Sequence, residues 1–138
     1  MTLINEAKSG STMYNNGDPN AFSLERYKKI PTDADYITLC FGLNDQTQEG
    51  PMGDLNDTSN ETVIGAWNVV LEYLITNIPY AKIGIIIADA YLNSTMRDGI
   101  ISVAKYWGIP WLDLKGDPKV PMLIGGKFSE TSISPKAV

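Results

Sequence analysis

The feature that most limits the fold of this chain is a nearly continuous apolar run, Lys82 to Ala88, in which isoleucine occupies four of seven positions. A run this short and this rich in β-branched residues predicts a strand. Because its residues do not alternate between apolar and polar, we expect both faces of that strand to be buried. Such strands are typical of parallel sheets covered by helices, so the run points to an α/β fold.

Amphipathic helices are predicted on both sides of this run. Thr58-Ser59-Asn60-Glu61 has the Ser/Thr-x-x-Glu form of a capping box. Apolar residues then recur at helical spacing until Pro79 ends the pattern, namely Val63, Trp67, Val70, Leu71, Leu74 and Ile78. After the run, Thr95 is the expected N-cap of a second helix, and Gly108 is a natural residue to end it.

The remaining elements complete an alternating order of strands and helices. Further strands are predicted at Thr2–Asn5, Asp35–Phe41 and Ile109–Asp113, a short helix at Phe22–Ile30, a polar loop at 42–60, and an irregular tail from about residue 115. Parallel strands joined by right-handed helical crossovers follow from this order. We therefore expect one α/β domain over residues 1–138, with a three-layer, flavodoxin-like parallel sheet and helices on both of its faces.

Histidine is absent from the chain, and this absence excludes several kinds of site. The chain cannot supply the base of a Ser-His-Asp or Cys-His site, or an imidazole ligand for a metal. Cys40 is the single cysteine, so an intrachain disulfide and a cysteine-rich zinc site are excluded. Because Cys40 lies in the apolar run 36–41, we expect it to be a buried, small hydrophobic residue. No metal and no cofactor are expected.

Charge and hydropathy exclude several classes of binding partner. Eleven basic and sixteen acidic residues give a net charge of −5, which argues against binding to nucleic acid or anionic lipid. The longest aliphatic run is far shorter than the ~20 residues that span a bilayer, and the first residues do not resemble a signal peptide. The expected location is therefore the cytoplasm or a larger soluble assembly, with no contact to a membrane.

In parallel α/β sheets, chemistry collects where strands end, so the residues after each predicted strand are the first candidates. These are Ser9-Gly10, Gly42-Leu43-Asn44-Asp45, Asp89 and Asp113. Two of these loops carry a resemblance to one family. Asn5-Glu6-Ala7-Lys8-Ser9-Gly10-Ser11-Thr12 resembles the second block of the SGNH (GDSL-type) hydrolases, and Gly42-Leu43-Asn44-Asp45 resembles their third block, Gly-x-Asn-Asp.

The resemblance covers roughly residues 2 to 115, and it implies the roles of particular residues. In this family, an oxyanion hole stabilises the negative charge that ester hydrolysis places on a carbonyl oxygen. Carried over, the backbone amide of Gly10 and the side-chain amide of Asn44 are two of its three donors. Ser9 and Asp45 are supporting residues, and Asp45 is expected to fix the loop as a hydrogen-bond acceptor. Two alternatives stay open: Gly10 as an ordinary turn glycine, and Asn44-Asp45 as a turn or cap pair.

The sequence also departs from the family. The first block, Gly-Asp-Ser, should precede Asn5, and the last block, Asp-x-x-His, should follow the tail, yet neither is present. Neither a nucleophile nor a base is therefore assigned, and a serine such as Ser11 has no evident base to activate it. The chain is expected to be an internal fragment whose sheet lacks the family's first, central strand. Either Thr2–Asn5 then pairs directly with Asp35–Phe41, or a second molecule fills the gap by strand exchange.

Two functions are consistent with these residues. The first is the middle of a serine esterase or acylhydrolase domain that acts on a small-molecule or carbohydrate ester, such as an O-acetyl ester of a carbohydrate, and that is inactive as this isolated chain. The alternative is a non-catalytic binding or structural module, because Gly65-Ala66-Trp67-Asn68 and Phe22-Ser23-Leu24-Glu25-Arg26-Tyr27 are similar to segments of phage-tail and prophage proteins.

Overall fold

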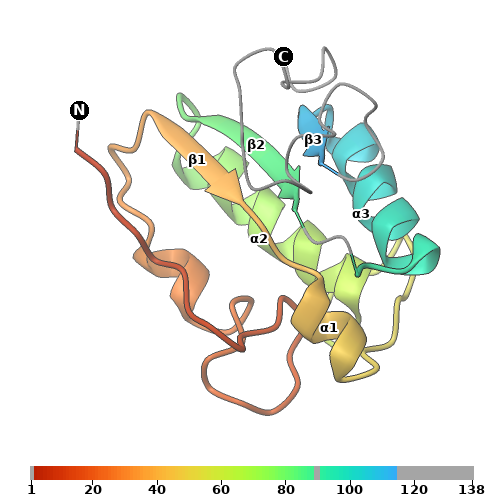
Figure 1. Ribbon diagram of the computed structural model, residues 1–138. Coiled ribbons are helices and arrows are strands. Elements are labelled where there is room, and N and C mark those ends of the chain that lie inside the picture. Colours follow the sequence, from red (N-terminus) through yellow and green to blue (C-terminus); the bar gives the residue numbers. More distant parts are fainter. Residues whose placement is uncertain (1, 89–90, 115–138) are drawn as a thin grey trace.

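A computed structural model of the chain describes residues 2–88 and 91–114. Its centre is a parallel sheet with the strand order β1-β2-β3 (Figure 1). The strands are β1 (Tyr36–Leu39), β2 (Lys82–Ile87) and β3 (Trp111–Asp113). Ile37 lies opposite Ile83 in the first pair, and Ile85 lies opposite Trp111 in the second. The predicted α/β class with a parallel sheet is thus confirmed.

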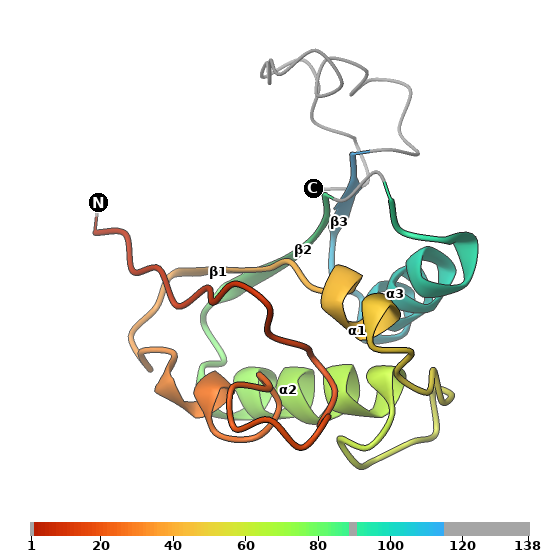
Figure 2. The ribbon, with the colours of Figure 1, turned by 60° about the horizontal axis from the view of Figure 1, so that its bottom comes forward.

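Two long helices form the connections between these strands. Helix α2 (Val63–Asn77) joins β1 to β2, and helix α3 (Ser94–Trp107) joins β2 to β3. Right-handed crossovers between neighbouring parallel strands place their helices on the same side of a sheet. Figure 2 shows both helices on one face. In the described part of the chain, the two long helices therefore cover one face of the sheet, whereas helices were expected on both faces.

The hydrophobic core lies between the sheet and these two helices. Trp67, Leu71 and Leu74 of α2 are fully buried, and Ile85 and Ile87 of β2 are 1% exposed. The residues that were expected to form the apolar face of α2 thus face the sheet. The Trp67 ring also contacts the Phe41 ring edge-on at 6.2 Å, so the end of β1 is held against the middle of α2.

Both long helices begin at a different cap from the one predicted. The Thr62 hydroxyl, not the Thr58 box, caps α2 by accepting a 3.0 Å bond from the Gly65 N–H. Asn93, not Thr95, caps α3 by accepting a 2.8 Å bond from the Met96 N–H. Both true caps stand directly before the first helical residue, where a side-chain oxygen reaches the free amides. The predicted end of α3 is correct, because Gly108 adopts the left-handed conformation there.

Two shorter helices also differ from expectation. The predicted helix at Phe22–Ile30 is reduced to the 3-10 helix η1 (Arg26–Lys29). The polar segment predicted as a loop contains the five-residue helix α1 (Leu43–Thr47). The sequence of α1 shows no apolar residues at helical spacing, and its side chains bind neighbouring loops. The sequence pattern alone therefore could not predict this helix.

The predicted strand Thr2–Asn5 is absent, and its predicted pairing with Asp35–Phe41 is wrong. Residues 2–10 are exposed and form no strand, because an extended segment without a hydrogen-bonded neighbour has no ladder to join. Cys40 is exposed rather than buried. It follows Tyr36 and Thr38 in alternation, and these side chains point away from the face that the helices cover. Asp89 and the tail from residue 115 lie outside the described residues.

No helix in the described ranges is both long and apolar enough to cross a membrane.

Candidate functional site

The candidate site begins with a sharp turn at the carboxyl end of β1. Gly42 has φ of 135°, a conformation that residues with a side chain rarely adopt. A Cβ atom placed there would lie 2.9 Å from the Cδ1 atom of Ile100 in α3. Glycine is therefore required for both its conformation and its close approach to α3. The turn directs the chain into α1, which lies beyond the end of the sheet (Figure 1).

Asp45 of α1 fixes the loop that follows the N-terminal segment. Its side chain is fully buried, and its Oδ1 atom accepts 2.9 Å bonds from the N–H groups of both Met13 and Tyr14. Its Oδ2 atom accepts a longer bond of 3.1 Å from Met13. Burial raises the pKa of this carboxyl above 3.8, and the backbone bonds from Tyr14 and Met13 oppose that rise. Asp45 thus acts as an acceptor that holds two distant segments together.

Asn44 connects the same two segments through its side-chain amide. Its Nδ2 atom donates a 3.0 Å hydrogen bond to the carbonyl oxygen of Ser11, 33 residues away in the sequence. A carboxamide nitrogen carries two N–H groups, so the bond to Ser11 leaves one for a ligand. Because one N–H is anchored, the direction of the other is fixed in advance, as an oxyanion donor requires.

Two glutamines of the same region also bind distant loops, and the sequence analysis missed both. Gln46 donates to the Tyr91 carbonyl at 3.1 Å and accepts from the Asn93 N–H at 2.7 Å. Gln48 accepts a 2.6 Å bond from the Asn16 side chain. Together with Asn44 and Asp45, these residues bind α1 and the residue after it to two separate segments, residues 11–16 and 91–93. The sequence signal that could have identified the two glutamines is a run of amide and acid side chains directly after a buried strand.

Gly10 occupies the third position of a tight turn. The Ser11 N–H donates to the Lys8 carbonyl at 3.3 Å, and Gly10 has φ of 79°, as a type II turn requires. No atom lies within 4 Å of a Cβ built at this glycine. The conformation of the turn, rather than a close approach, therefore requires glycine here. Ser9 is exposed in the same turn.

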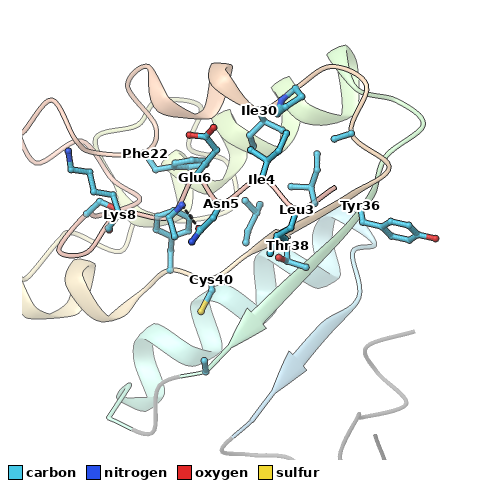
Figure 3. A pocket seen from close by; sticks show the side chains of 18 of the residues that line it. Leu3, Ile4, Asn5, Glu6, Lys8, Phe22, Ile30, Tyr36, Thr38 and Cys40 are labelled. Carbon is cyan, nitrogen blue, oxygen red and sulfur yellow. Dashed lines mark hydrogen bonds between the residues drawn. The ribbon is translucent and has the colours of Figure 1, made fainter. Parts of the chain in front are cut away.

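A cavity of about 980 Å³ reaches this region from the side of β1 (Figure 3). Lys8, Ser11 and Asn44 are part of its lining, while Ser9 and Gly10 are not. The structure therefore brings the loops of the two sequence blocks together and places Asn44 at the cavity. The donor role of the Gly10 amide stays a prediction.

Within residues 2–88 and 91–114 the site offers neither an activated nucleophile nor a metal centre. The Ser11 hydroxyl donates to the Lys8 carbonyl at 3.0 Å, in the same turn, and the chain has no histidine that could act as its base. No three side chains among His, Cys, Asp and Glu are close enough together to hold a metal ion in this part of the chain. What the arrangement can do chemically is to present oriented hydrogen-bond donors to a ligand.

No model of a protein family matches the chain, and a search of curated proteins gives no match. Solved structures do match. A protein from Lactobacillus plantarum is 28% identical with a TM-score of 0.70, over 88% of this chain and 66% of that one. A protein from Bacteroides uniformis, described as a GDSL-like lipase, is 23% identical with a TM-score of 0.67, over 80% and 55%. A second protein described as a GDSL-like lipase, from Bacteroides ovatus, is 18% identical with a TM-score of 0.67, over 93% of this chain and 61% of that one.

These matches show that the α/β fold is shared with proteins described as GDSL-like lipases. The chain spans between 55% and 66% of the length of the three structures.

Proposed function

We propose that this chain is part of an SGNH-type hydrolase domain that cleaves carboxylic esters, and that it supplies oxyanion-binding donors. The observation that carries the proposal is the bond from Asn44 to the Ser11 carbonyl. It orients a neutral side-chain donor at the carboxyl end of β1, where it also lines a cavity. In a parallel α/β sheet this end of the strands is where ligands bind. The shared fold with GDSL-like lipases supports the same proposal.

The chemistry follows from where charge develops in ester hydrolysis. Attack on the ester carbonyl places negative charge on its oxygen, and a preorganised donor stabilises that charge by roughly 3–4 kcal/mol. Asn44 suits this role because its amide donates without carrying a charge. Asp45 acts indirectly, because its bonds to Met13 and Tyr14 hold the loop that anchors Asn44. The Gly10 amide is the second donor that we propose.

A histidine base would have to come from outside these 138 residues, because the chain contains no histidine. We expect the nucleophile to come from elsewhere as well, since within residues 2–88 and 91–114 the Ser11 hydroxyl bonds the Lys8 carbonyl and no side chain that could act as its base. The isolated chain should therefore be inactive. The substrate that we propose is an acyl ester of a small molecule or carbohydrate, such as an O-acetyl group, and this substrate class rests on analogy with the fold.

Ester hydrolysis by the polypeptide as the cell makes it, including any residues that flank these 138, tests the proposal. With p-nitrophenyl acetate as the probe, Asn44→Ala should lower kcat by about 10²–10³-fold, as expected for one oxyanion donor. Thr47→Ala is the matched control, since Thr47 is exposed on the same helix and bonds only the Leu43 carbonyl in the described part of the chain. Asn44→Ala with undiminished kcat, or a natural polypeptide without activity, would favour a non-catalytic binding module instead.

A further inference from the structure

Helix α1 carries the proposed oxyanion donor, but it is too short to hold its own position. It has five residues, Leu43–Thr47. Helices of this length are unstable in water on their own, because few backbone bonds offset the cost of starting a helix. The place of α1 at the end of β1 therefore depends on the contacts that its side chains make with the rest of the molecule.

On one side, α1 is attached to the loop that follows the N-terminal segment. Asn44 donates to the Ser11 carbonyl. Asp45 accepts from the N–H groups of Met13 and Tyr14, which both belong to the hydrophobic core. This attachment is firm, but an attachment on one side alone allows a short helix to turn about its own axis.

Gln46 supplies a second attachment on the opposite side of the helix. Successive helical residues are rotated by about 100°, so the side chains of Asn44 and Gln46 leave the helix about 200° apart. The Gln46 Nε2 atom donates to the Tyr91 carbonyl at 3.1 Å, and its Oε1 atom accepts from the Asn93 N–H at 2.7 Å. Both polar atoms of one side chain therefore bind the backbone of residues 91–93.

Residues 91–93 form a firm anchor, because they are fixed to α3 and to the turn that precedes α1. The Asn93 side chain caps α3 by accepting from the Met96 N–H at 2.8 Å. Leu92 is 3% exposed, and a Cβ atom built at Gly42 would lie 3.5 Å from its Cδ2 atom. Figure 1 shows α1 between the red and orange N-terminal loops and the start of α3. The helix is thus held from two sides.

We infer that Gln46 is a positioning residue for Asn44. By joining α1 to the start of α3, it stops the helix from turning and fixes the direction of the second Asn44 N–H. A displacement of about 1 Å at a catalytic group can lower a rate about 10²-fold. Loss of the Gln46 attachment leaves the contacts to Ser11 and from Asp45 in place, so we expect a smaller fall in kcat, of about 10-fold. The effect on catalysis rests on the proposed function, whereas the control of the Asn44 amide does not.

Gln46→Met tests this inference, because methionine keeps the length of the side chain and forms neither bond. In the natural polypeptide with isotope-labelled asparagine, NMR relaxation of the Asn44 side-chain amide measures how firmly that amide is held. The amide should be rigid in the unchanged protein and mobile in Gln46→Met. Gln46→Glu keeps the acceptor for the Asn93 N–H and loses the donor to the Tyr91 carbonyl, so it should give intermediate mobility. Urea unfolding shows which variants fold, and either folded variant is sufficient for the test.

Ester hydrolysis separates positioning from contact with the substrate. With p-nitrophenyl acetate, Gln46→Met should lower kcat about 10-fold and leave KM within about twofold, because the lost attachment affects the transition state. Thr47→Ala is the control, and it should leave both kcat and the mobility of the Asn44 amide nearly unchanged.

An Asn44 amide that is as rigid in the Gln46 variants as in the unchanged protein would overturn the inference. A raised KM with unchanged kcat would also overturn it, since Gln46 would then contact the substrate. If Asn44→Ala itself kept its kcat, the proposed function would fail, while the NMR comparison would still decide whether Gln46 positions the amide.

Discussion

Replacing Asp45 by alanine tests the contact that joins the two loops of the site. The substitution leaves the buried N–H groups of Met13 and Tyr14 without their acceptor. A buried donor without a partner costs about 1–3 kcal/mol, so two of them cost about 2–6 kcal/mol. The variant also removes a carboxyl whose burial is itself unfavourable, as its raised pKa shows. We therefore expect Asp45→Ala to lower the free energy of unfolding by about 2–4 kcal/mol.

Urea unfolding, followed by tryptophan fluorescence, measures this difference. Asp18→Ala is the matched control, because the Asp18 carboxylate accepts a bond from the Asn20 N–H at 2.8 Å on the exposed surface. Its loss should change stability by only about 0.5 kcal/mol, since water can replace the bond. If Asp45→Ala destabilised the chain no more than Asp18→Ala does, the bonds from Met13 and Tyr14 would not be what holds the loops together.

Three further predictions concern the same region. Because burial raises the pKa of Asp45, the folded chain keeps this proton over a range of pH above 3.8 in which the unfolded chain has lost it. The stability of the native chain relative to Asp45→Asn should therefore fall as pH rises through that range, by at most about 1.4 kcal/mol per pH unit, in urea titrations of both proteins. Gly42→Ala should destabilise the chain by about 2–3 kcal/mol, because φ is 135° at this position and the added Cβ would lie 2.9 Å from the Cδ1 atom of Ile100. A loss of stability under about 1 kcal/mol would contradict this strain. Gly10→Ala should cost only about 1–2 kcal/mol, because its φ of 79° is unfavourable but the space is open, and equal losses for the two variants would contradict the difference in packing.

The parts of the fold that depend on burial could be predicted from the sequence. The isoleucine run of β2 and the apolar stripe of α2 indicated which residues are buried, because a residue buried on a given face must be apolar. The left-handed Gly108 at the end of α3 was predictable for a similar reason, since few other residues adopt that conformation. These features are local consequences of the position that each residue occupies.

The features that depend on long-range polar contacts were harder to predict. Helix α1 is held by bonds from Asn44, Asp45 and Gln46 to loops that are more than 30 residues away, and no local pattern encodes them. The prediction of a strand at Thr2–Asn5 failed for the opposite reason. Its residues favour a strand, but no strand among the described residues pairs with them. The apolar neighbours of Cys40 predict that it is buried, whereas the alternation that begins in β1 turns its side chain outward. The resemblance identified Asn44 as a candidate, and the structure supplied its anchor at Ser11.

The kcat for p-nitrophenyl acetate of the natural polypeptide, compared between the unchanged protein and Asn44→Asp, tests the oxyanion role with little change in side-chain shape. Aspartate can neither donate to the Ser11 carbonyl nor stabilise a negative oxygen. The account predicts a fall in kcat of at least about 10²-fold, while Thr47→Ala stays near the unchanged rate. A rate for Asn44→Asp within about twofold of the unchanged protein would show that Asn44 does not stabilise the reacting oxygen.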